Sequence, residues 1–283
     1  MPTHHGLDQA LWPAIAAAAL FILPSTAGGQ NRLLPDTPTF SYPLASTQVE
    51  GLVGRVVETS VSDNALGPGT EADVGIGKIF PLLALQDGKN PLHVAFEGQV
   101  TGRFSMHDDK SSLLSSEWWV GFNLTKQWAK WDATLQLYHE SSHLGDELAE
   151  TFSLTRLDWT RAVVAAWVGR RLGPFRLAGS VSRVLRGKPD LPPLAAAAGL
   201  DWFGPHFGLA GTPIQVVAGV FGDAAAQTEW RLSVMGRVGL VLGGAGGRRS
   251  LSISFIAYDG VSLQSQFYDQ SSSYLGGELR LDL

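Results

Sequence analysis

The sequence predicts an all-β protein, a closed antiparallel transmembrane β-barrel of about twelve strands. The first observation is that apolar and polar residues alternate with a period of two along most of the chain, as in half-buried strands. The second is that many alternating segments run for about ten residues or more, the length of a tilted strand that crosses a membrane. The third is that their polar faces carry arginine and glutamate together, which is typical of a hydrated lumen.

The composition excludes other classes of protein. The chain has 283 residues and no cysteine, so it forms neither disulfide bonds nor thiolate metal sites. Its formal net charge of −5 argues against nucleic acid as a partner, because such binding needs a basic face. Beyond the N-terminal region no stretch approaches the roughly 18 apolar residues of a spanning helix.

The N-terminal region has the pattern of a targeting segment. Residues 11–24 (LWPAIAAAALFILP) form an apolar core, and small residues follow it up to position 28. This order predicts a signal peptide over residues 1–27, although the segment before the apolar core lacks lysine and arginine. A short buried helix or a retained anchor is the alternative. We expect residues 28–47 to form an N-terminal periplasmic lead and residues 48–283 to form an outer-membrane β-barrel.

The alternation also predicts where the strands lie and which end of the barrel faces outward. We expect strands near residues 48–60, 70–85, 91–105, 116–128, 131–143, 154–169, 175–186, 193–203, 212–224, 228–242, 248–260 and 272–283. If the first strand runs outward, the inner turns are mostly short and glycine-rich, such as QWAKW and LGGAGGR. The outer loops, such as HDDKSSLLSS and LGDELAETFS, are mostly longer and more acidic. This asymmetry is that of a bacterial outer-membrane barrel.

The segment 131–143 combines alternation with an unusual run of reactive side chains. Its odd positions from Trp131 to Leu137 are apolar and should face lipid, whereas its even positions from Asp132 to Glu140 are polar and should face the lumen. Carried onward, the same register places His139, Ser141 and His143 on the lipid side at the outer end. Polar side chains are costly on a lipid-facing wall, although less so near the interface.

One explanation for these residues is chemistry on lipids. A serine hydroxyl becomes a good nucleophile when a neighbouring base takes its proton. Residues two apart on a strand point to the same side, so His139 could serve as the base and Ser141 as the nucleophile. Together they would meet the ester of a phospholipid or of lipopolysaccharide. A structural reading is equally open, in which both side chains tie the strand tip to a loop.

The stretch Tyr138-His139-Glu140-Ser141-Ser142 resembles the H-x-S-N segment of the outer-membrane phospholipase A family. That resemblance implies a twelve-stranded barrel with the histidine and serine outside the wall. It also implies a third catalytic residue, an asparagine at the start of the next strand. Residues 154–159 (LTRLDW) resemble the matching run of the family, and there Thr155 stands at the place of the asparagine. Asp158 is the alternative residue to orient the histidine.

A second resemblance covers nearly the whole mature chain. The residues from His139 to Glu147 resemble the signature H-x-S-S-H-x-G-D-E of a domain-of-unknown-function family of outer-membrane proteins. The tail segment from Tyr258 to Tyr268 resembles the Y-x-G-x-S-x-x-x-Q-F-Y segment of the same family. This resemblance implies a barrel in the outer membrane and supplies no activity.

Acidic residues in the loop after this strand suggest a metal site. Asp146, Glu147 and Glu150 offer carboxylate oxygens of the kind that Ca²⁺ prefers. The phospholipase resemblance implies calcium near this loop, whereas an acidic outer loop without a ligand role is the alternative.

Arg161 interrupts the expected lipid face of the segment 154–169, which would consist of Leu157, Trp159, Val163, Ala165 and Trp167. Either Arg161 extends toward lipid phosphates or a bulge changes the register there.

These observations lead to a working hypothesis with two branches. The first is an outer-membrane lipid-directed serine hydrolase that uses His139, Ser141 and either Thr155 or Asp158, with Ca²⁺ as the only cofactor considered. The second is a non-enzymatic barrel, either structural or a narrow channel. In both branches we expect membrane lipids as partners and the barrel-assembly machinery during biogenesis, and a homodimer stays open.

Overall fold

The computed structural model describes residues 30–35, 40–87, 90–209, 211–243 and 249–282, so the predicted signal peptide lies outside the described residues. The described chain forms one antiparallel sheet. Its strands are β1 (Gln30–Leu33), β2 (Gly51–Val61), β3 (Thr70–Asp87), β4 (Leu92–Ser105), β5 (Leu113–Trp128), β6 (Trp131–Leu144), β7 (Trp159–Leu172), β8 (Phe175–Lys188), β9 (Leu194–Leu209), β10 (Thr212–Ala225), β11 (Ser233–Gly243), β12 (Ser250–Val261) and β13 (Ser271–Asp282).

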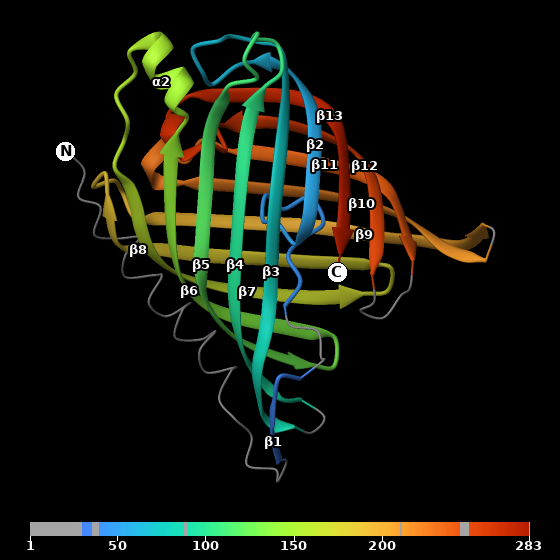
Figure 1. Ribbon diagram of the computed structural model, residues 1–283. Coiled ribbons are helices and arrows are strands. Elements are labelled where there is room, and N and C mark those ends of the chain that lie inside the picture. The colour runs from blue at the N-terminus through green and yellow to red at the C-terminus, as the bar shows by residue number, and fades with distance from the viewer. Residues whose placement is uncertain (1–29, 36–39, 88–89, 210, 244–248, 283) are drawn as a thin grey trace.

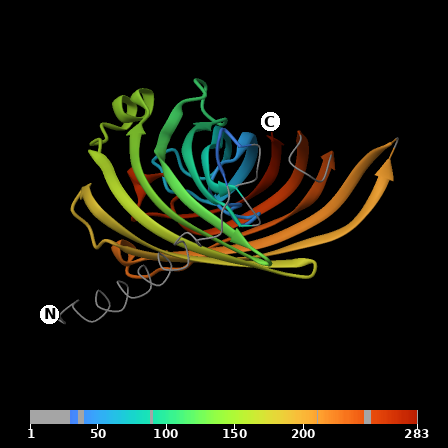
Figure 2. The same cartoon turned by 90° about the horizontal axis from the view of Figure 1, so that it is seen from below.

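The sheet closes into a barrel. Each strand from β2 to β13 pairs with its neighbours in the sequence, and β2 also pairs with β13, which joins the two ends of the sheet. Figure 1 shows the barrel with β3 to β6 running steeply across the direction of β9 to β12, and Figure 2 shows it turned by 90°. The predicted closed antiparallel barrel of twelve strands is therefore confirmed. The short β1 is an additional strand that pairs with the last residues of β3.

The two ends of the barrel differ in the length of their connections. At one end few residues separate the paired strands, between β3 and β4, β5 and β6, β7 and β8, β9 and β10, and β11 and β12. At the other end lie the loops 62–69, 106–112, 145–158, 189–193, 226–232 and 262–270, which include helix α2 (Asp146–Phe152) and the short helices η1 (Ala226–Thr228) and η2 (Ser265–Phe267). The second end is the outer one, because the longer loops of bacterial barrels face the cell exterior. None of the helices in the described chain is long and apolar enough to span a membrane.

The outer wall is apolar around most of its circumference. Leu137, for example, is 55% exposed. The large apolar side chains that project outward include Val56, Ile76, Phe122, Leu137, Leu177, Leu200, Val238, Phe255 and Leu275. Water-soluble proteins rarely expose an apolar surface of this extent. Contact with lipid accounts for it, since a lipid-facing barrel wall carries an apolar band.

The chain segment that precedes β2 lies inside the lumen. Phe40, Tyr42, Ala45 and Val49 are buried, and the ring of Phe40 lies 5.8 Å from that of Trp167 on β7. Part of the region predicted as a periplasmic lead therefore lies inside the barrel. The segment is also tied by hydrogen bonds, because Asp201 on β9 accepts one from the backbone nitrogen of Leu44, and Gln99 on β4 accepts one from that of Val49.

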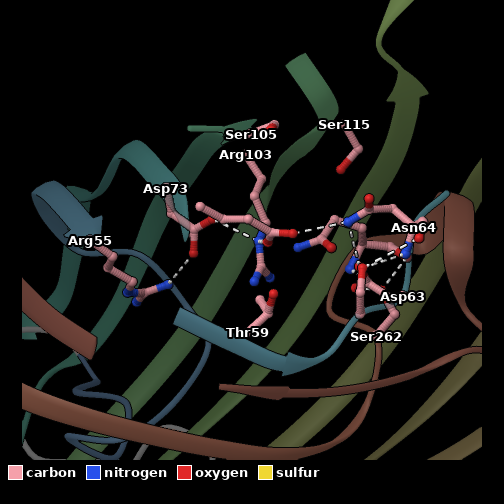
Figure 3. A network of polar contacts seen from close by, with 12 residues as sticks. Arg55, Thr59, Asp63, Asn64, Asp73, Arg103, Ser105, Ser115 and Ser262 are labelled. Carbon is pink, nitrogen blue, oxygen red and sulfur yellow. Dashed lines mark hydrogen bonds and ion pairs between the residues drawn. The ribbon is translucent and has the colours of Figure 1, made fainter. Parts of the chain in front are cut away.

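Charged side chains of the lumen pair with one another. Glu278 on β13 contacts Arg55 and Arg237 at 2.7 Å each. Arg103 on β4 contacts Glu71 at 2.5 Å and Asp73 at 3.4 Å. Figure 3 shows how this network continues toward the outer loops, where Asn64 bonds to Glu71 and Asp63, and Asp63 accepts a hydrogen bond from Ser262. The network thereby joins the wall to the loop between β12 and β13.

One predicted face is wrong. The lumen side of β7 carries the buried residues Trp159, Val163, Ala165 and Trp167. Arg161 lies on the same side and contacts Glu140 at 3.1 Å. The alternation does not identify the lipid side of β7, because both of its faces are apolar. Its outer face carries Ala162, Val164, Ala166 and Val168. Its inner face is apolar because it packs against the segment that fills the lumen.

Candidate functional site

The candidate site begins with the orientation of β6. Leu137 is 55% exposed, whereas Gln136 is 1% exposed and bonds inside the lumen to Asn123 and Glu97. The odd positions of β6 therefore face outward, as the alternation predicts. His139 and His143 are exposed and Ser141 is half-buried on this same side. Because β6 ends at Leu144, next to the loop that contains α2, these three residues lie at the outer end of the wall.

The strand register defines which side chains surround them. Ser141 lies opposite Trp118 on β5 and opposite Thr160 on β7. His139 lies opposite Val120 on β5 and Ala162 on β7. Residues directly opposite one another on neighbouring strands share a face, so the wall around the two polar residues is built from an indole ring, a threonine and small apolar side chains.

A threonine supplies the polar contact of the histidine. Thr160 Oγ1 lies 3.4 Å from His139 Nε2. Among the described residues, no hydrogen bond joins the hydroxyl group of Ser141 to His139. The structure thus brings His139, Ser141 and Thr160 together on the lipid side of two adjacent strands. The hydroxyl of Ser141 forms no hydrogen bond within the part of the chain that the structure describes.

Thr155 and Asp158 lie elsewhere. Both are exposed in the loop between α2 and β7, because β7 begins only at Trp159. Asp158 forms an exposed ion pair of 2.9 Å with Lys188. The residue that contacts His139 is Thr160, which sequence reasoning missed. The signal that could have found it is the pairing of β6 with β7, which sets Thr160 opposite Ser141.

The neighbouring serine has a different environment. Ser142 points into the lumen, where its hydroxyl donates to Glu117 Oε1 at 2.7 Å. The same oxygen of Glu117 accepts from the backbone nitrogen of Ser265 at 3.1 Å. The side-chain amide of Gln266 donates to the carbonyl oxygen of Ser142 and to that of Leu157. The tail segment noted in the sequence therefore closes over the outer mouth of the barrel and holds the end of β6.

The acidic residues of α2 do not form a metal site. Asp146 is bound to Arg156 at 2.6 Å, and both side chains are exposed. Glu147 and Glu150 are exposed on the same short helix. In the part of the chain that the structure describes, no group of three or more histidine or acidic side chains is placed to hold a metal ion. The residues present therefore do not fit calcium at this loop.

Comparison with solved structures shows the fold. The chain is similar to the outer membrane phospholipase (OMPLA) dimer with bound calcium from Salmonella typhi, with a TM-score of 0.54 and 14% identity over 94% of this chain and 97% of that chain. It is also similar to outer membrane phospholipase A from Escherichia coli, with a TM-score of 0.54 and 12% identity over the same shares of the two chains. The comparison with curated proteins finds no match.

The fold and the apolar wall together locate the protein in the bacterial outer membrane. The comparison with protein families spans the whole described chain. Residues 30–282 match one family along their full length, and the chain belongs to that family, described as protein of unknown function (DUF1207).

Proposed function

We propose that this protein is a lipid-directed serine hydrolase of the outer membrane, with His139 as general base and Ser141 as nucleophile. One observation carries the proposal: both residues lie on the lipid side at the outer end of β6, with Thr160 Oγ1 3.4 Å from the His139 ring. Polar side chains at this level meet lipid headgroups and the first part of the acyl chains. A lipid ester could therefore reach the site without leaving the bilayer.

The reaction follows from the roles of these groups. Ser141 Oγ attacks the carbonyl carbon of the ester while His139 accepts its proton, and the alcohol then leaves with that proton. Water attacks the acyl group on Ser141 with the same base, which releases the fatty acid and restores the serine. If the Nε2–H of His139 donates to Thr160, the Nδ1 lone pair is left to act as the base.

The serine and the histidine must approach one another for this step. They are two residues apart on one face, roughly 6–7 Å along the strand. Rotation about the side-chain bonds closes such a span, and catalytic hydrogen bonds often form only when the substrate is bound. The activity of the similar phospholipases guides the choice of phospholipid as a first substrate. Because the acidic residues of α2 form no metal site, we assign no step to calcium.

The test is release of fatty acid by the refolded protein in mixed micelles of phospholipid or lipid A. Ser141→Ala and His139→Ala should each lower kcat by about 10²–10⁴-fold. Matched controls are Ser116→Ala on β5 and His143→Ala on β6, which lie opposite one another on the same wall. Both controls should retain activity. A fluorophosphonate probe should label Ser141 and no other serine.

Two outcomes would contradict the proposed hydrolase activity. One is fatty acid release that survives Ser141→Ala, and the other is no release from any of these lipids by a correctly folded barrel. A structural role for the same segment would then be favoured. It is supported by the contacts of Gln266 with Ser142 and Leu157, which tie β6 to the loop over the barrel mouth. A homodimer and contact with the barrel-assembly machinery stay predictions.

A further inference from the structure

The outer wall beside His139 and Ser141 carries two cations that the proposed reaction does not use. Register pairs Thr160 of β7 with Lys188 of β8, and Ala162 with Arg186. One row across the wall therefore runs from Ser141 through Thr160 to Lys188, and the next runs from His139 through Ala162 to Arg186. Neighbouring strands lie about 4.8 Å apart, so β8 is roughly 10 Å from β6.

A β-bulge turns these two cations outward. Near its start, β8 buries its even positions, since Arg176 is 3% and Ala178 is 2% exposed. The register shifts between Ala162 and Val163, with Val184 opposite Val163 and Arg186 opposite Ala162, which leaves Leu185 as the extra residue. After the shift the even positions face outward, and both Arg186 and Lys188 are exposed. Bulges of this kind re-aim side chains and are frequent beside functional sites.

Glycine at position 187 fits the same arrangement. A Cβ atom on Gly187 would lie 2.7 Å from the side chain of Arg161, which occupies the lumen side. The residue between the two cations therefore faces inward and must lack a side chain. The bulge thus changes the direction of Arg186 and Lys188 while the inner packing around Arg161 is kept.

The charges of these side chains are poorly neutralised by the protein. Arg186 forms no hydrogen bond or ion pair with any residue of the described chain. Lys188 contacts only the exposed carboxylate of Asp158 among these residues, and exposed pairs of this kind contribute little. A cation on a lipid-facing wall is costly unless it reaches an anion at the interface. Guanidinium groups bind phosphate in a bidentate manner, and lysine binds it as a point charge.

We propose that Arg186 and Lys188 bind the phosphate group of a lipid in the outer leaflet, with its acyl chains along the wall toward Ser141. The inference that the substrate is a phosphorylated lipid rests on the proposed hydrolysis. The binding itself needs no reaction. It is a binding site on β8, separate from His139, Ser141 and Thr160.

The test measures lipid binding in a protein that cannot hydrolyse. Ser141→Ala barrels in detergent are incubated with phosphatidylglycerol, lipid A, diacylglycerol or inorganic phosphate, and bound lipid is counted by native mass spectrometry. Both phosphorylated lipids should be retained more strongly than diacylglycerol. Arg186→Gln and Lys188→Gln should each weaken retention by roughly tenfold, whereas Arg186→Lys should lose less than Arg186→Gln.

The matched control is Arg170→Gln on β7. Arg170 is exposed over the ring of Trp131 near the periplasmic end of the wall, so its loss should leave retention unchanged. Unchanged heat-modifiable migration in gels confirms that each variant folds. Equal retention of diacylglycerol, binding of inorganic phosphate without lipid, or retention that survives Arg186→Gln with Lys188→Gln would each overturn the inference. Absence of fatty acid release by the unsubstituted protein would contradict the proposed hydrolase activity but not the proposed lipid-binding site.

Discussion

The hydroxyl group of Tyr42 donates a hydrogen bond of 2.7 Å to Glu97 in the middle of the lumen. Tyr42 precedes β2, and Glu97 lies on β4. Asn123 and Gln136 also donate to Glu97, at 2.7 Å and 3.1 Å, and Gln136 donates to the hydroxyl oxygen of Tyr42. One carboxylate thus ties the segment that fills the lumen to three adjacent strands of the wall.

Removal of this hydroxyl group should destabilise the barrel. Tyr42→Phe deprives both Glu97 and Gln136 of a buried partner, so we expect a loss of about 1–3 kcal/mol in the free energy of unfolding. The measurement is urea-induced unfolding in lipid vesicles. The matched control is Tyr268→Phe, because the hydroxyl group of Tyr268 forms no hydrogen bond within the described chain. Glu97→Gln combined with Tyr42→Phe should be less than additive, and equal effects of the two tyrosine variants would contradict the assignment.

The chain segment inside the lumen also predicts the electrical behaviour of the protein. Phe40, Tyr42 and Val49 occupy space that would otherwise be open to water. In planar bilayers the intact protein should show no conductance steps. Deletion of residues 40–48 should produce them, provided that the shortened barrel keeps its heat-modifiable migration. Conductance steps of the same size in the intact and the shortened protein would favour the narrow channel that the sequence left as an alternative.

Glu278 should be among the most sensitive charged residues of the wall. Its carboxylate contacts Arg55 and Arg237 at 2.7 Å and Arg280 at 3.6 Å. Glu278→Gln leaves these buried guanidinium groups without their shared anion, which should cost about 3–5 kcal/mol of stability. Asp146→Asn breaks the exposed pair with Arg156 and should cost less than about 1 kcal/mol. Similar urea midpoints for the two variants would argue against a network that holds the wall together.

The outer mouth offers a prediction about Gln266. Its side chain donates to the carbonyl oxygens of Ser142 and Leu157 and accepts from the backbone nitrogen of Leu157. Gln266→Ala removes all three bonds, so the loop 262–270 should become cleavable by added protease on intact cells. Gln270→Ala is the control, since the side chain of Gln270 contacts only its neighbour Asp269 among the described residues. Cleavage of both variants at the same rate would show that Gln266 does not hold the loop.

The fold was largely predictable from the sequence because alternation with a period of two is a direct consequence of strand geometry. Alternation does not distinguish the two sides of a strand whose faces are both apolar, and this explains the inverted face of β7 around Trp167. Residues 40–50 have no regular period, and contacts such as that of Tyr42 with Glu97 hold them in the lumen. Such contacts join residues far apart in the chain.

The same limits apply to the candidate site. The parity of β6 suffices to place His139 and Ser141 on one outward face, since Leu137 and Gln136 mark the two sides clearly. Thr160 was missed because the expected face of β7 put its even positions in the lumen, whereas the pairing of β6 with β7 sets it opposite Ser141 on the outer face. Arg186 and Lys188 could not be placed outward either, because the bulge at Leu185 changes the parity within one strand.

Thr160 should act as a positioning residue for His139, and this can be separated from a purely structural role. Thr160→Val keeps the shape of the side chain and removes the oxygen that lies 3.4 Å from Nε2. We expect kcat for fatty acid release to fall by about 10- to 100-fold with little change in KM, because the ring loses its orientation while lipid binding persists. Thr160→Ser should restore most of the activity. Thr155→Val and Asp158→Asn should stay near the level of the unsubstituted protein, because both residues lie in the exposed loop before β7. A large loss of kcat in Asp158→Asn with full activity in Thr160→Val would assign the orientation of His139 to the loop instead.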